Sequence, residues 1–202
     1  MPTLDIGCGD VRDPAADVGM DFYPFPGATI VHDVSQFPWP IEQASFDRAI
    51  AHEIIEHLPV RDDTAGEDLF FRFFDEVWRI LKPGGILDFD VPHANGTAAY
   101  GDPTHRRFFT EEAFNFLWNP KRGPLYPRKL WELVELKVDY FYGAGGLNQW
   151  HFRKYLPRID HLFCRMKVGT PHLIWVTLRK PISDPPVARA HPSSDPASLT
   201  TT

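Results

Sequence analysis

The sequence predicts an α/β fold with a sheet that ends in an antiparallel pair of strands. Short apolar segments of strand character alternate with segments of helical periodicity over the first 120 residues. Two long segments rich in β-branched and aromatic residues follow, and they are typical of paired strands. The first apolar segment ends at two glycines spaced by one residue, a turn found at strand ends in α/β sheets.

The apolar pattern sets the expected elements in chain order. Four short strands come first, over residues 3–6, 18–22, 29–31 and 46–51. A short helical segment is expected over residues 52–58. A longer helix is expected over residues 68–81, where apolar side chains recur at helical spacing: Leu69, Phe70, Phe73, Phe74, Val77, Trp78 and Leu81.

The second half of the chain continues the pattern. The sequence KPGG at residues 82–85 ends the long helix, and a strand is expected over residues 86–91. Thr110, followed by two glutamates, predicts the cap of a helix that runs to about residue 118. The two long strands are expected over residues 131–142 and 172–179.

Two segments of this half are expected outside the sheet. Residues 143–170 are too long for a hairpin turn, so this insertion is expected to cover a site, near where an acceptor binds. Residues 181–202 contain five prolines and little to bury, which predicts a disordered tail after a single domain over residues 1–180.

Composition narrows the class of protein. The chain has 202 residues, 43% apolar and 24% charged, enough for one buried core. No stretch reaches the roughly 18 apolar residues of a membrane helix, and the start lacks the features of a signal peptide. Cys8 and Cys164 form neither a disulfide framework nor a four-cysteine zinc site. A reduced, cytoplasmic protein without a membrane segment is expected.

Charge is distributed unevenly along the chain. Residues 1–119 hold 8 Lys or Arg against 21 Asp or Glu, whereas residues 120–180 hold 12 against 4. Such a chain can hold a cation at one end and an anionic group at the other. Two solvated faces without a partner explain the same pattern, and this simpler interpretation is favoured.

The sequence LDIGCGD at residues 4–10 carries the most information. Gly7 and Gly9 allow the backbone to turn sharply and to approach a ligand closely at a strand end, where α/β sheets bind nucleotides. A dinucleotide fingerprint requires a third glycine at position 12, and this chain has Arg12. NAD(P) and FAD are therefore disfavoured, and a tight turn without a ligand remains the alternative.

Two carboxylates strengthen the ligand interpretation. Asp21 ends the second strand, where an acid accepts hydrogen bonds from both hydroxyls of an adenosine ribose. Asp33 follows the third strand and is able to reach an adenine amine. Each acid alone is more often a loop residue or a helix cap. Together with the GCGD turn after the first strand, however, they make three acid-bearing turns at successive strand ends, which rarely occur together by chance.

At this point the chain resembles the class I S-adenosylmethionine-dependent methyltransferases, in particular their short-loop, type 11-like members. The motifs that carry the resemblance follow in family order within residues 3–118: LDIGCGD, GMD, VHDVSQFPWP, FDRAIAHEIIEHLP and EVWRILKPGGILDFDVP. The resemblance implies a Rossmann-like, doubly wound mixed sheet with a reversed terminal strand.

The resemblance also implies roles for individual residues. Asp5, Gly7 and Gly9 shape the cofactor loop, and Asp21 binds the ribose of S-adenosylmethionine. The residues that flank the adenine and the methionine part are then Asp33 with Val34, and His52, respectively.

Two departures from the family pattern stand out. Only residues 10–17, interrupted by Pro14, separate the glycine turn from the second strand, so the usual helix is missing. The chain also begins almost at the first strand, without the N-terminal helix that helps to close the cofactor pocket. The site is expected to be more open, or to receive its lid from another segment or subunit.

A second constellation lies after the fourth strand. Glu53, Glu56 and His57 are spaced i, i+3, i+4 and would share one face of a helix, as ligands of a divalent cation. His105 is the best fourth ligand from elsewhere in the chain, with His93 second. The pattern is similar to small-RNA 3′-terminal 2′-O-methyltransferases and to ubiquinone-pathway catechol O-methyltransferases.

The resemblance to these enzymes implies Mg²⁺ or Mn²⁺ acting as a Lewis acid on the acceptor hydroxyl. Glu56 and His57 could instead satisfy a buried hydrogen-bond network. Without a metal, His57, His105 or His93 could act as the general base, since neutral imidazole has a suitable pKa.

The basic residues of the second half alternate with aromatic residues. Such a pattern can bind single-stranded nucleic acid or a phosphorylated small molecule, but aromatic core residues under a basic surface are the favoured interpretation. Within the insertion, Trp150, His151 and Phe152 are expected above the acceptor pocket, with Arg153 and Lys154 facing an anionic acceptor.

The leading hypothesis is an S-adenosylmethionine-dependent methyltransferase that acts on oxygen, either of a small molecule or of a sugar or ribose hydroxyl, with metal assistance as an option. The alternative is a non-catalytic methyltransferase-fold binding subunit that needs a partner. An NAD-dependent oxidoreductase is argued against by Arg12. The expected partner is a small-molecule acceptor; RNA is not favoured, a membrane is not expected, and an oligomer remains open.

Overall fold

The computed structural model describes residues 1–60, 68–121, 129–141 and 169–183. Most of the predicted insertion and tail, and with them Arg153 and Lys154, lie outside the described residues. The elements in chain order are β1 (Thr3–Ile6), β2 (Val18–Asp21), β3 (Ile30–Val31), β4 (Phe46–His52), η1 (Ile55–His57), α1 (Leu69–Ile80), β5 (Leu81–Pro92), α2 (Ala98–Gly101), η2 (Glu111–Phe114), α3 (Asn115–Trp118), β6 (Glu132–Phe141) and β7 (Thr170–Arg179). No helix among the described residues is long and apolar enough to cross a membrane.

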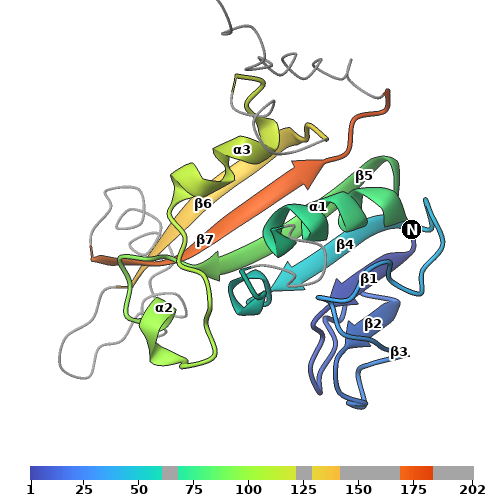
Figure 1. Ribbon diagram of the computed structural model, residues 1–202, viewed down its shortest axis with the longest axis horizontal. Coiled ribbons are helices and arrows are strands. Elements are labelled where there is room, and N and C mark those ends of the chain that lie inside the picture. Colours follow the sequence, from blue (N-terminus) through green and yellow to red (C-terminus); the bar gives the residue numbers. More distant parts are fainter. Residues whose placement is uncertain (61–67, 122–128, 142–168, 184–202) are drawn as a thin grey trace, which may run out of the picture.

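The strands form one mixed sheet in the order β3-β2-β1-β4-β5-β7-β6 (Figure 1). The first five strands are parallel, whereas β7 is antiparallel to both β5 and β6. The predicted mixed sheet with a reversed terminal strand is therefore confirmed. The chain leaves β1 towards β2 on one side and β4 lies on its other side, so the strand order reverses at β1. Ligands of such sheets bind at this reversal, outside the carboxyl ends of the strands.

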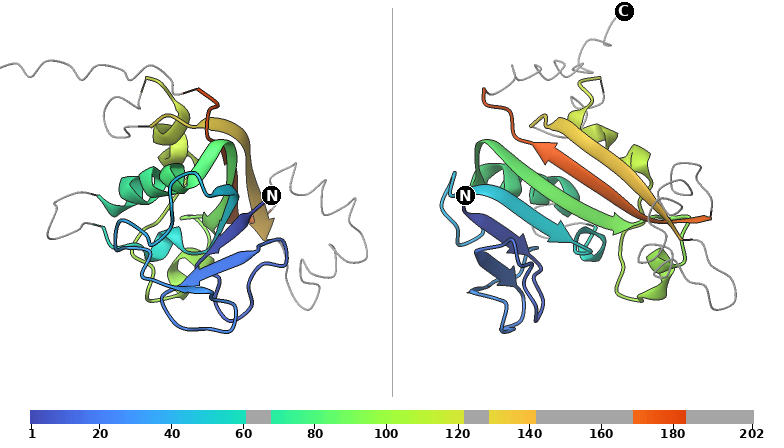
Figure 2. Two further views of the ribbon diagram at one scale, coloured as in Figure 1. Left: turned by 90° about the vertical axis from the view of Figure 1, so that its right-hand side faces the viewer. Right: turned by 180° about the vertical axis from the view of Figure 1, so that it is seen from behind.

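Both α1 and α3 lie on one face of the sheet, as the two views of Figure 2 show. The α1 helix packs through Phe73 against Trp39 and through Phe74 against Phe89 of β5, while Phe114 before α3 also contacts Phe89. The opposite face carries polar side chains; Asp88, for example, bonds Arg48 at 2.7 Å and Thr177 at 2.6 Å. In the described ranges the sheet is thus covered by helices on one face.

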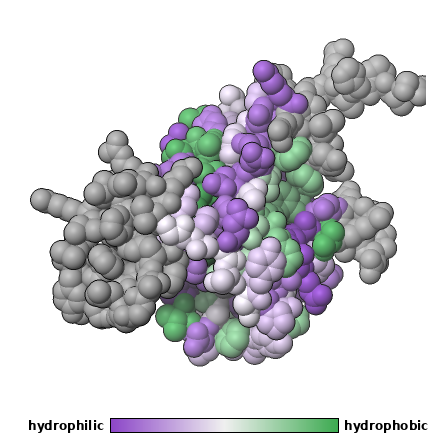
Figure 3. Space-filling model, turned by 90° about the vertical axis from the view of Figure 1, so that its left-hand side faces the viewer, coloured by the Kyte–Doolittle hydropathy of each residue, from purple (hydrophilic) through white to green (hydrophobic). Residues whose placement is uncertain are grey.

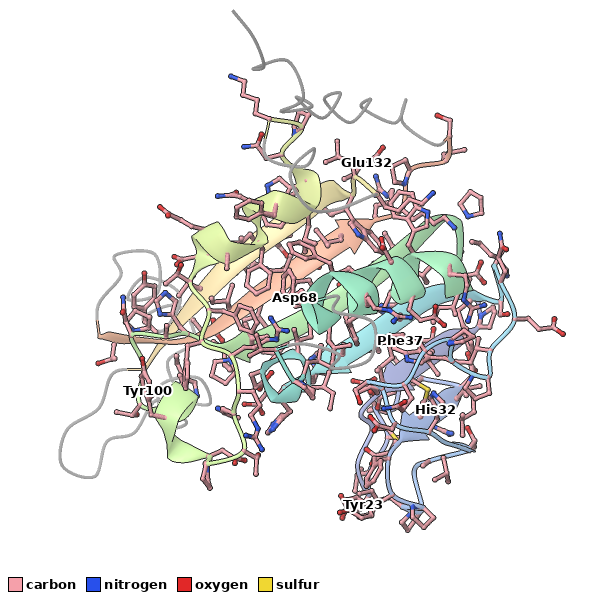
Figure 4. All side chains as sticks on the ribbon, in the orientation of Figure 1. Tyr23, His32, Phe37, Asp68, Tyr100 and Glu132 are labelled. Carbon is pink, nitrogen blue, oxygen red and sulfur yellow. The ribbon has the colours of Figure 1, made fainter. Side chains whose placement is uncertain are left out.

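The long helix was predicted to within one residue at each end. The Asp68 carboxylate accepts a hydrogen bond from the Phe70 amide at 2.8 Å and so caps α1, at the position labelled in Figure 4. Thr110 is the N-cap residue of η2, as predicted, but its side chain makes no capping hydrogen bond. The segment after it forms a 3-10 turn before the four residues of α3, rather than one continuous helix.

The helical segment predicted over residues 52–58 is shorter in the structure than predicted. The β4 strand continues to His52, and only Ile55–His57 form a short 3-10 helix. Between them Glu53 has a positive φ of 46°, and its amide donates to the Asp90 carbonyl of β5. A helix cannot begin before this residue because its backbone lies in the left-handed region.

Candidate functional site

The glycine turn lies at the carboxyl end of β1, as the sequence predicts, and the strand order reverses at this strand. Gly7 and Gly9 both have positive φ values, 75° and 59°. The Gly7 amide donates to the Met20 carbonyl of β2 at 2.8 Å, which fastens the turn to the neighbouring strand. A Cβ atom on Gly7 would lie 2.8 Å from the Ile54 side chain, whereas one on Gly9 would meet nothing within 4 Å. The space beside Gly9 is therefore open to a ligand.

The Asp21 carboxylate faces this turn. One oxygen accepts a hydrogen bond from the Gly9 amide at 2.9 Å, and the other accepts one from the Tyr23 amide at 3.0 Å. Each carboxylate oxygen has two acceptor positions, so both can still accept from the hydroxyls of a ribose. Asp21 thus combines two functions: it holds the loops on either side and presents acceptors to the open space.

The predicted adenine-flanking residues line a pocket of about 290 Å³. Asp33 is held at its rim by bonds from the amide and the hydroxyl of Ser35 to one carboxylate oxygen, at 2.8 and 2.7 Å. The other lining residues are mainly apolar, as suits a flat aromatic ring; they are Phe22, Val34, Ile54, His57, Leu58 and Pro59. Sequence reasoning missed Phe22 and Ile54, although Phe22 directly follows Asp21.

Asp5 and His52 lie at the other end of the glycine turn. Asp5 is buried, accepts a bond from the Asp13 amide at 2.8 Å, and has its pKa raised by burial. His52 is hydrogen-bonded through Nδ1 to the buried Asp90 carboxylate, which raises the pKa of the imidazole. The His52 ring also packs edge-on against Trp175, 5.4 Å between centroids. Asp90 and Trp175 were not singled out by sequence reasoning.

His52 and Trp175 line a second pocket, of about 470 Å³. This pocket extends over the polar face of the sheet, where its other lining residues include Arg48, Asp88 and Lys137. It is bordered by Asp13 and Ala15 from the short loop that stands in place of the usual helix. The missing helix, noted in the sequence, thus leaves this part of the sheet open.

Three side chains, two from η1 and one from the segment after α2, form a cluster at the carboxyl edge of the sheet. Glu56, His57 and His105 each offer a ligand atom, and these atoms lie within 4.8 Å of one another. Glu56 is 1% exposed, and neither carboxylate oxygen has a hydrogen-bond partner among the described residues. Burial raises the pKa of Glu56 to about 8, with the charges of Glu53 and Asp90 adding to the effect. Burial and the neighbouring His105 lower the pKa of His57.

The backbone holds this cluster together. The amides of Arg106 and Arg107 donate to the Glu56 carbonyl at 2.8 and 3.1 Å, which brings His105 beside η1. The Arg107 guanidinium donates to three carbonyls after η1, those of Leu58, Pro59 and Val60, and to the Asp68 carboxylate.

Two predicted residues do not join the cluster. Glu53 is exposed, and its positive φ separates it from the short 3-10 helix that carries Glu56 and His57. His93 is buried elsewhere: its Nε2 is 3.0 Å from a Glu111 carboxylate oxygen, and its Nδ1 accepts from the Asn95 amide. Both ring nitrogens of His93 are therefore engaged in holding the segment after β5.

Sequence reasoning missed the residues that contact the two histidines of the cluster. Thr104 Oγ1 is 2.9 Å from His57 Nδ1 and donates to Asp102 at 2.7 Å. The Nδ1 atom of His105 is 2.9 Å from the Ala99 carbonyl oxygen. The side of the molecule at the left of Figure 1, which Figure 3 presents, has hydrophilic and hydrophobic residues intermixed on its coloured surface.

Comparisons with known proteins bear on the domain and the fold. Residues 16–89 match the family model of a methyltransferase domain. No curated protein sequence matches the chain significantly. The fold is similar to that of an S-adenosylmethionine-dependent methyltransferase from Archaeoglobus fulgidus, with a TM-score of 0.55 and 15% identity over 89% of this chain and 86% of that one.

Two further solved structures extend the comparison. One is an S-adenosylmethionine-dependent methyltransferase from Mesorhizobium loti, with a TM-score of 0.50 and 16% identity over 88% of this chain and 90% of that one. The other is from a complex of a methyltransferase with the Haloferax volcanii Trm112 methyltransferase activator, with a TM-score of 0.54 and 13% identity over 89% of this chain and 82% of that one. Residues 16–89 thus match a methyltransferase domain, and the chain shares the fold of solved S-adenosylmethionine-dependent methyltransferases.

Proposed function

We propose that this chain, which has the class I S-adenosylmethionine-dependent methyltransferase fold, transfers a methyl group from that cofactor to a hydroxyl oxygen. The observation that carries the proposal is the Asp21 carboxylate, which is bonded to the Gly9 amide beside open space at the strand-order reversal. An acid in this position suits the two hydroxyls of an adenosine ribose.

The residues present fit the rest of the cofactor. The pocket of about 290 Å³ beside Asp33 and Val34 takes the adenine, between Phe22 and Ile54. Asp5 and His52, at the other end of the turn, would lie near the methionine part. When bound, S-adenosylmethionine supplies an electrophilic methyl group on a sulfonium, and holding donor and acceptor in line provides much of the rate.

Glu56, His57 and His105 fit a divalent metal ion. A buried carboxylate with no partner among the described residues is costly unless a cation or a proton neutralises it. Two imidazoles and one carboxylate suit Mn²⁺ and other transition metals better than Mg²⁺, which prefers oxygen ligands. Without Glu53 in the cluster, Mn²⁺ is therefore favoured over Mg²⁺. When bound, the metal supplies a Lewis acid that lowers the pKa of a coordinated hydroxyl.

The chain's own groups can also move a proton. The lowered pKa of His57 keeps its imidazole neutral near pH 7, so it can accept a proton from an acceptor hydroxyl. His105 shares the site, whereas His93 is engaged with Glu111. His57 and His105 are thus the favoured general bases if the cluster works without metal.

The acceptor that we propose is a small-molecule, sugar or ribose hydroxyl. A metal ion held by these three side chains would have open coordination positions. The oxygens of a diol or of a deprotonated alcohol could fill them. The expected anionic acceptor depends on Arg153 and Lys154, which lie outside the described residues. A labelled-methyl transfer screen over phenols, sugars and short RNA identifies the acceptor class.

A second candidate function is a binding subunit that works with a partner. It is favoured by the similar fold found in complex with the Haloferax volcanii Trm112 methyltransferase activator. Labelled-methyl transfer by the purified chain distinguishes the two functions. An enzyme transfers the methyl group without a partner, whereas a binding subunit binds the cofactor without turnover.

Calorimetric titration with S-adenosylmethionine and S-adenosylhomocysteine tests the proposal. We expect Asp21→Asn to weaken the affinity for both about ten- to a hundredfold, because hydrogen bonds to a charged carboxylate contribute about 1.5–3 kcal/mol. The matched control is Asp10→Asn, an exposed acid in the loop after β1, which should leave both affinities unchanged. Absence of binding by the wild-type chain would exclude the proposed activity.

A further inference from the structure

We infer that Thr104 and Asp102 are positioning residues that hold the His57 imidazole with its proton on Nδ1 and its lone pair on Nε2. This inference rests on the proposed function in one respect, since the lone pair is useful to a metal ion held by Glu56, His57 and His105. Its physical basis is the direction of three hydrogen bonds that link Asp102, Thr104 and His57.

The hydroxyl of Thr104 has one proton, and the Asp102 carboxylate is the acceptor beside it. Thr104 Oγ1 donates to Asp102 Oδ1 at 2.7 Å, and the Thr104 amide donates to the same oxygen at 2.7 Å. These two bonds also hold the pKa of the Asp102 carboxyl below its usual value. An ionised carboxylate only accepts, so both protons belong to Thr104.

The contact with His57 then has one direction. Thr104 Oγ1 lies 2.9 Å from His57 Nδ1, and its only proton is already engaged in the hydrogen bond that it donates to Asp102. The hydroxyl oxygen must therefore accept, and Nδ1 must carry the proton. In a neutral imidazole the other nitrogen, Nε2, is left with the lone pair, which is the form that binds a metal.

The second histidine of the cluster is held in the same way by a different group. His105 Nδ1 lies 2.9 Å from the Ala99 carbonyl oxygen, which only accepts. Nδ1 of His105 therefore carries the proton, and Nε2, 4.0 Å from Glu56 Oε1, has the lone pair. Histidines that bind metals commonly donate their other N–H to a carbonyl or carboxylate.

A purely structural role for Thr104 predicts different behaviour. If the Asp102–Thr104 turn only fastens its loop, removing the hydroxyl changes stability without changing the tautomer of His57. Thr104 is exposed, so its replacement leaves the buried core intact. The test therefore needs a readout of the imidazole itself, in addition to a binding measurement.

The first measurement is nitrogen NMR of the metal-free protein labelled with ¹⁵N-histidine. In the wild type we expect a protonated Nδ1 and a non-protonated Nε2 for His57. Thr104→Val should shift His57 towards the other tautomer, and Thr104→Ser should restore the wild-type signals. Asp102→Ala should also shift the tautomer, because the freed Thr104 hydroxyl can then donate to Nδ1.

The second measurement is calorimetric titration of the same proteins with MnCl₂. Loss of a group that orients a metal-binding histidine typically weakens affinity about ten- to a hundredfold, which is the loss we expect for Thr104→Val. Thr104→Ser should stay near the wild type. The matched control is Thr97→Val, an exposed threonine whose side chain caps no helix, and it should change neither measurement.

The outcomes separate this inference from the proposed function. An unchanged His57 tautomer and an unchanged Mn²⁺ affinity in Thr104→Val would overturn the inference. A wild-type chain that binds S-adenosylmethionine but no Mn²⁺ would also overturn it, while leaving the cofactor site in place. A wild-type chain that binds Mn²⁺ but no S-adenosylmethionine would instead overturn the proposed function.

Discussion

At the scale of single residues, the carboxyl group of Glu56 is in the least favourable surroundings of the site. It is 1% exposed, and neither oxygen has a hydrogen-bond partner in the described part of the chain. Burial raises its pKa from 4.5 to about 8, so the metal-free site keeps a proton at neutral pH. A bound cation would replace that proton, which makes proton and metal competitors for one position.

This competition predicts how the metal-free protein responds to pH. The folded state keeps the Glu56 proton up to about pH 8, whereas the unfolded state releases it near 4.5. The free energy of unfolding should therefore fall as pH rises across this interval, by at most about 1.4 kcal/mol per pH unit. Glu56→Gln should remove this contribution and should be more stable than the wild type above pH 8.

Urea unfolding with a chelator, at pH 5.5 and at pH 8, measures this difference. Glu42→Gln, an exposed glutamate, is the control and should keep the wild-type pH dependence. If the free energy of unfolding changes equally with pH in Glu56→Gln and in the wild type, Glu56 is already ionised without metal. Added Mn²⁺ should stabilise the wild type more at pH 8 than at pH 5.5, because it binds the ionised carboxylate.

At the scale of elements, the site is assembled by contacts between η1 and the 102–107 segment. Arg107 is central to this junction because one planar guanidinium donates to three successive carbonyls after η1 and to Asp68, the cap of α1. Its centre also lies 5.9 Å from the Phe70 ring. A short 3-10 helix of three residues has little stability of its own, so its position depends on this junction.

Arg107→Met should therefore affect both stability and the metal site. We expect a loss of about 2–4 kcal/mol in the free energy of unfolding, because several carbonyls and a carboxylate lose a charged donor. Arg107→Lys should recover only part of it, since one ammonium cannot reproduce the fork of a guanidinium. Thermal unfolding and MnCl₂ titration measure the two effects.

The adjacent Arg106 provides a matched control. Its side chain is exposed, and Arg106→Met should change the free energy of unfolding by less than about 0.5 kcal/mol. Equal losses in the two variants would mean that the guanidinium bonds of Arg107 do not hold the junction.

At the scale of the whole molecule, Lys180 fastens the end of β7 to α1 and β5. Lys180 follows β7 and is buried, and its Nζ donates to the carbonyls of Trp78 and Leu81 at 2.8 and 2.7 Å. Its backbone pairs with the turn before Ile86 through bonds to Gly84 and Gly85. The boundary between domain and predicted tail therefore cannot lie before Lys180.

Truncation tests where the folded domain ends. A chain that stops after Ser183 should keep the wild-type melting temperature to within about 2 °C, because the proline-rich remainder has little to bury. A chain that stops after Arg179 should melt about 5–10 °C lower, since it loses the Lys180 bonds at the end of β7. A large loss on removing residues 184–202 alone would contradict the predicted tail.

Local sequence was sufficient for the strands, the long helix and the position of the glycine turn. Apolar periodicity identified α1 to within one residue, and the turn chemistry of Gly7 and Gly9 placed the glycine turn at a strand end. Asp21 lies beside that turn because it ends the parallel neighbour of β1. These features depend on residues close in sequence or on the regular spacing of strands, so a reader of the sequence can infer them.

The metal-like cluster depended on contacts between distant segments. The spacing of Glu53, Glu56 and His57 suggested a shared helical face, but the positive φ of Glu53, bonded to the Asp90 carbonyl of β5, excludes that helix. The fold of the chain after β5 brings His105, and not His93, to Glu56 and His57. It also places Thr104 between Asp102 and His57. Backbone conformation and side-chain pairing at such a junction are set by long-range hydrogen bonds, which residue spacing does not encode.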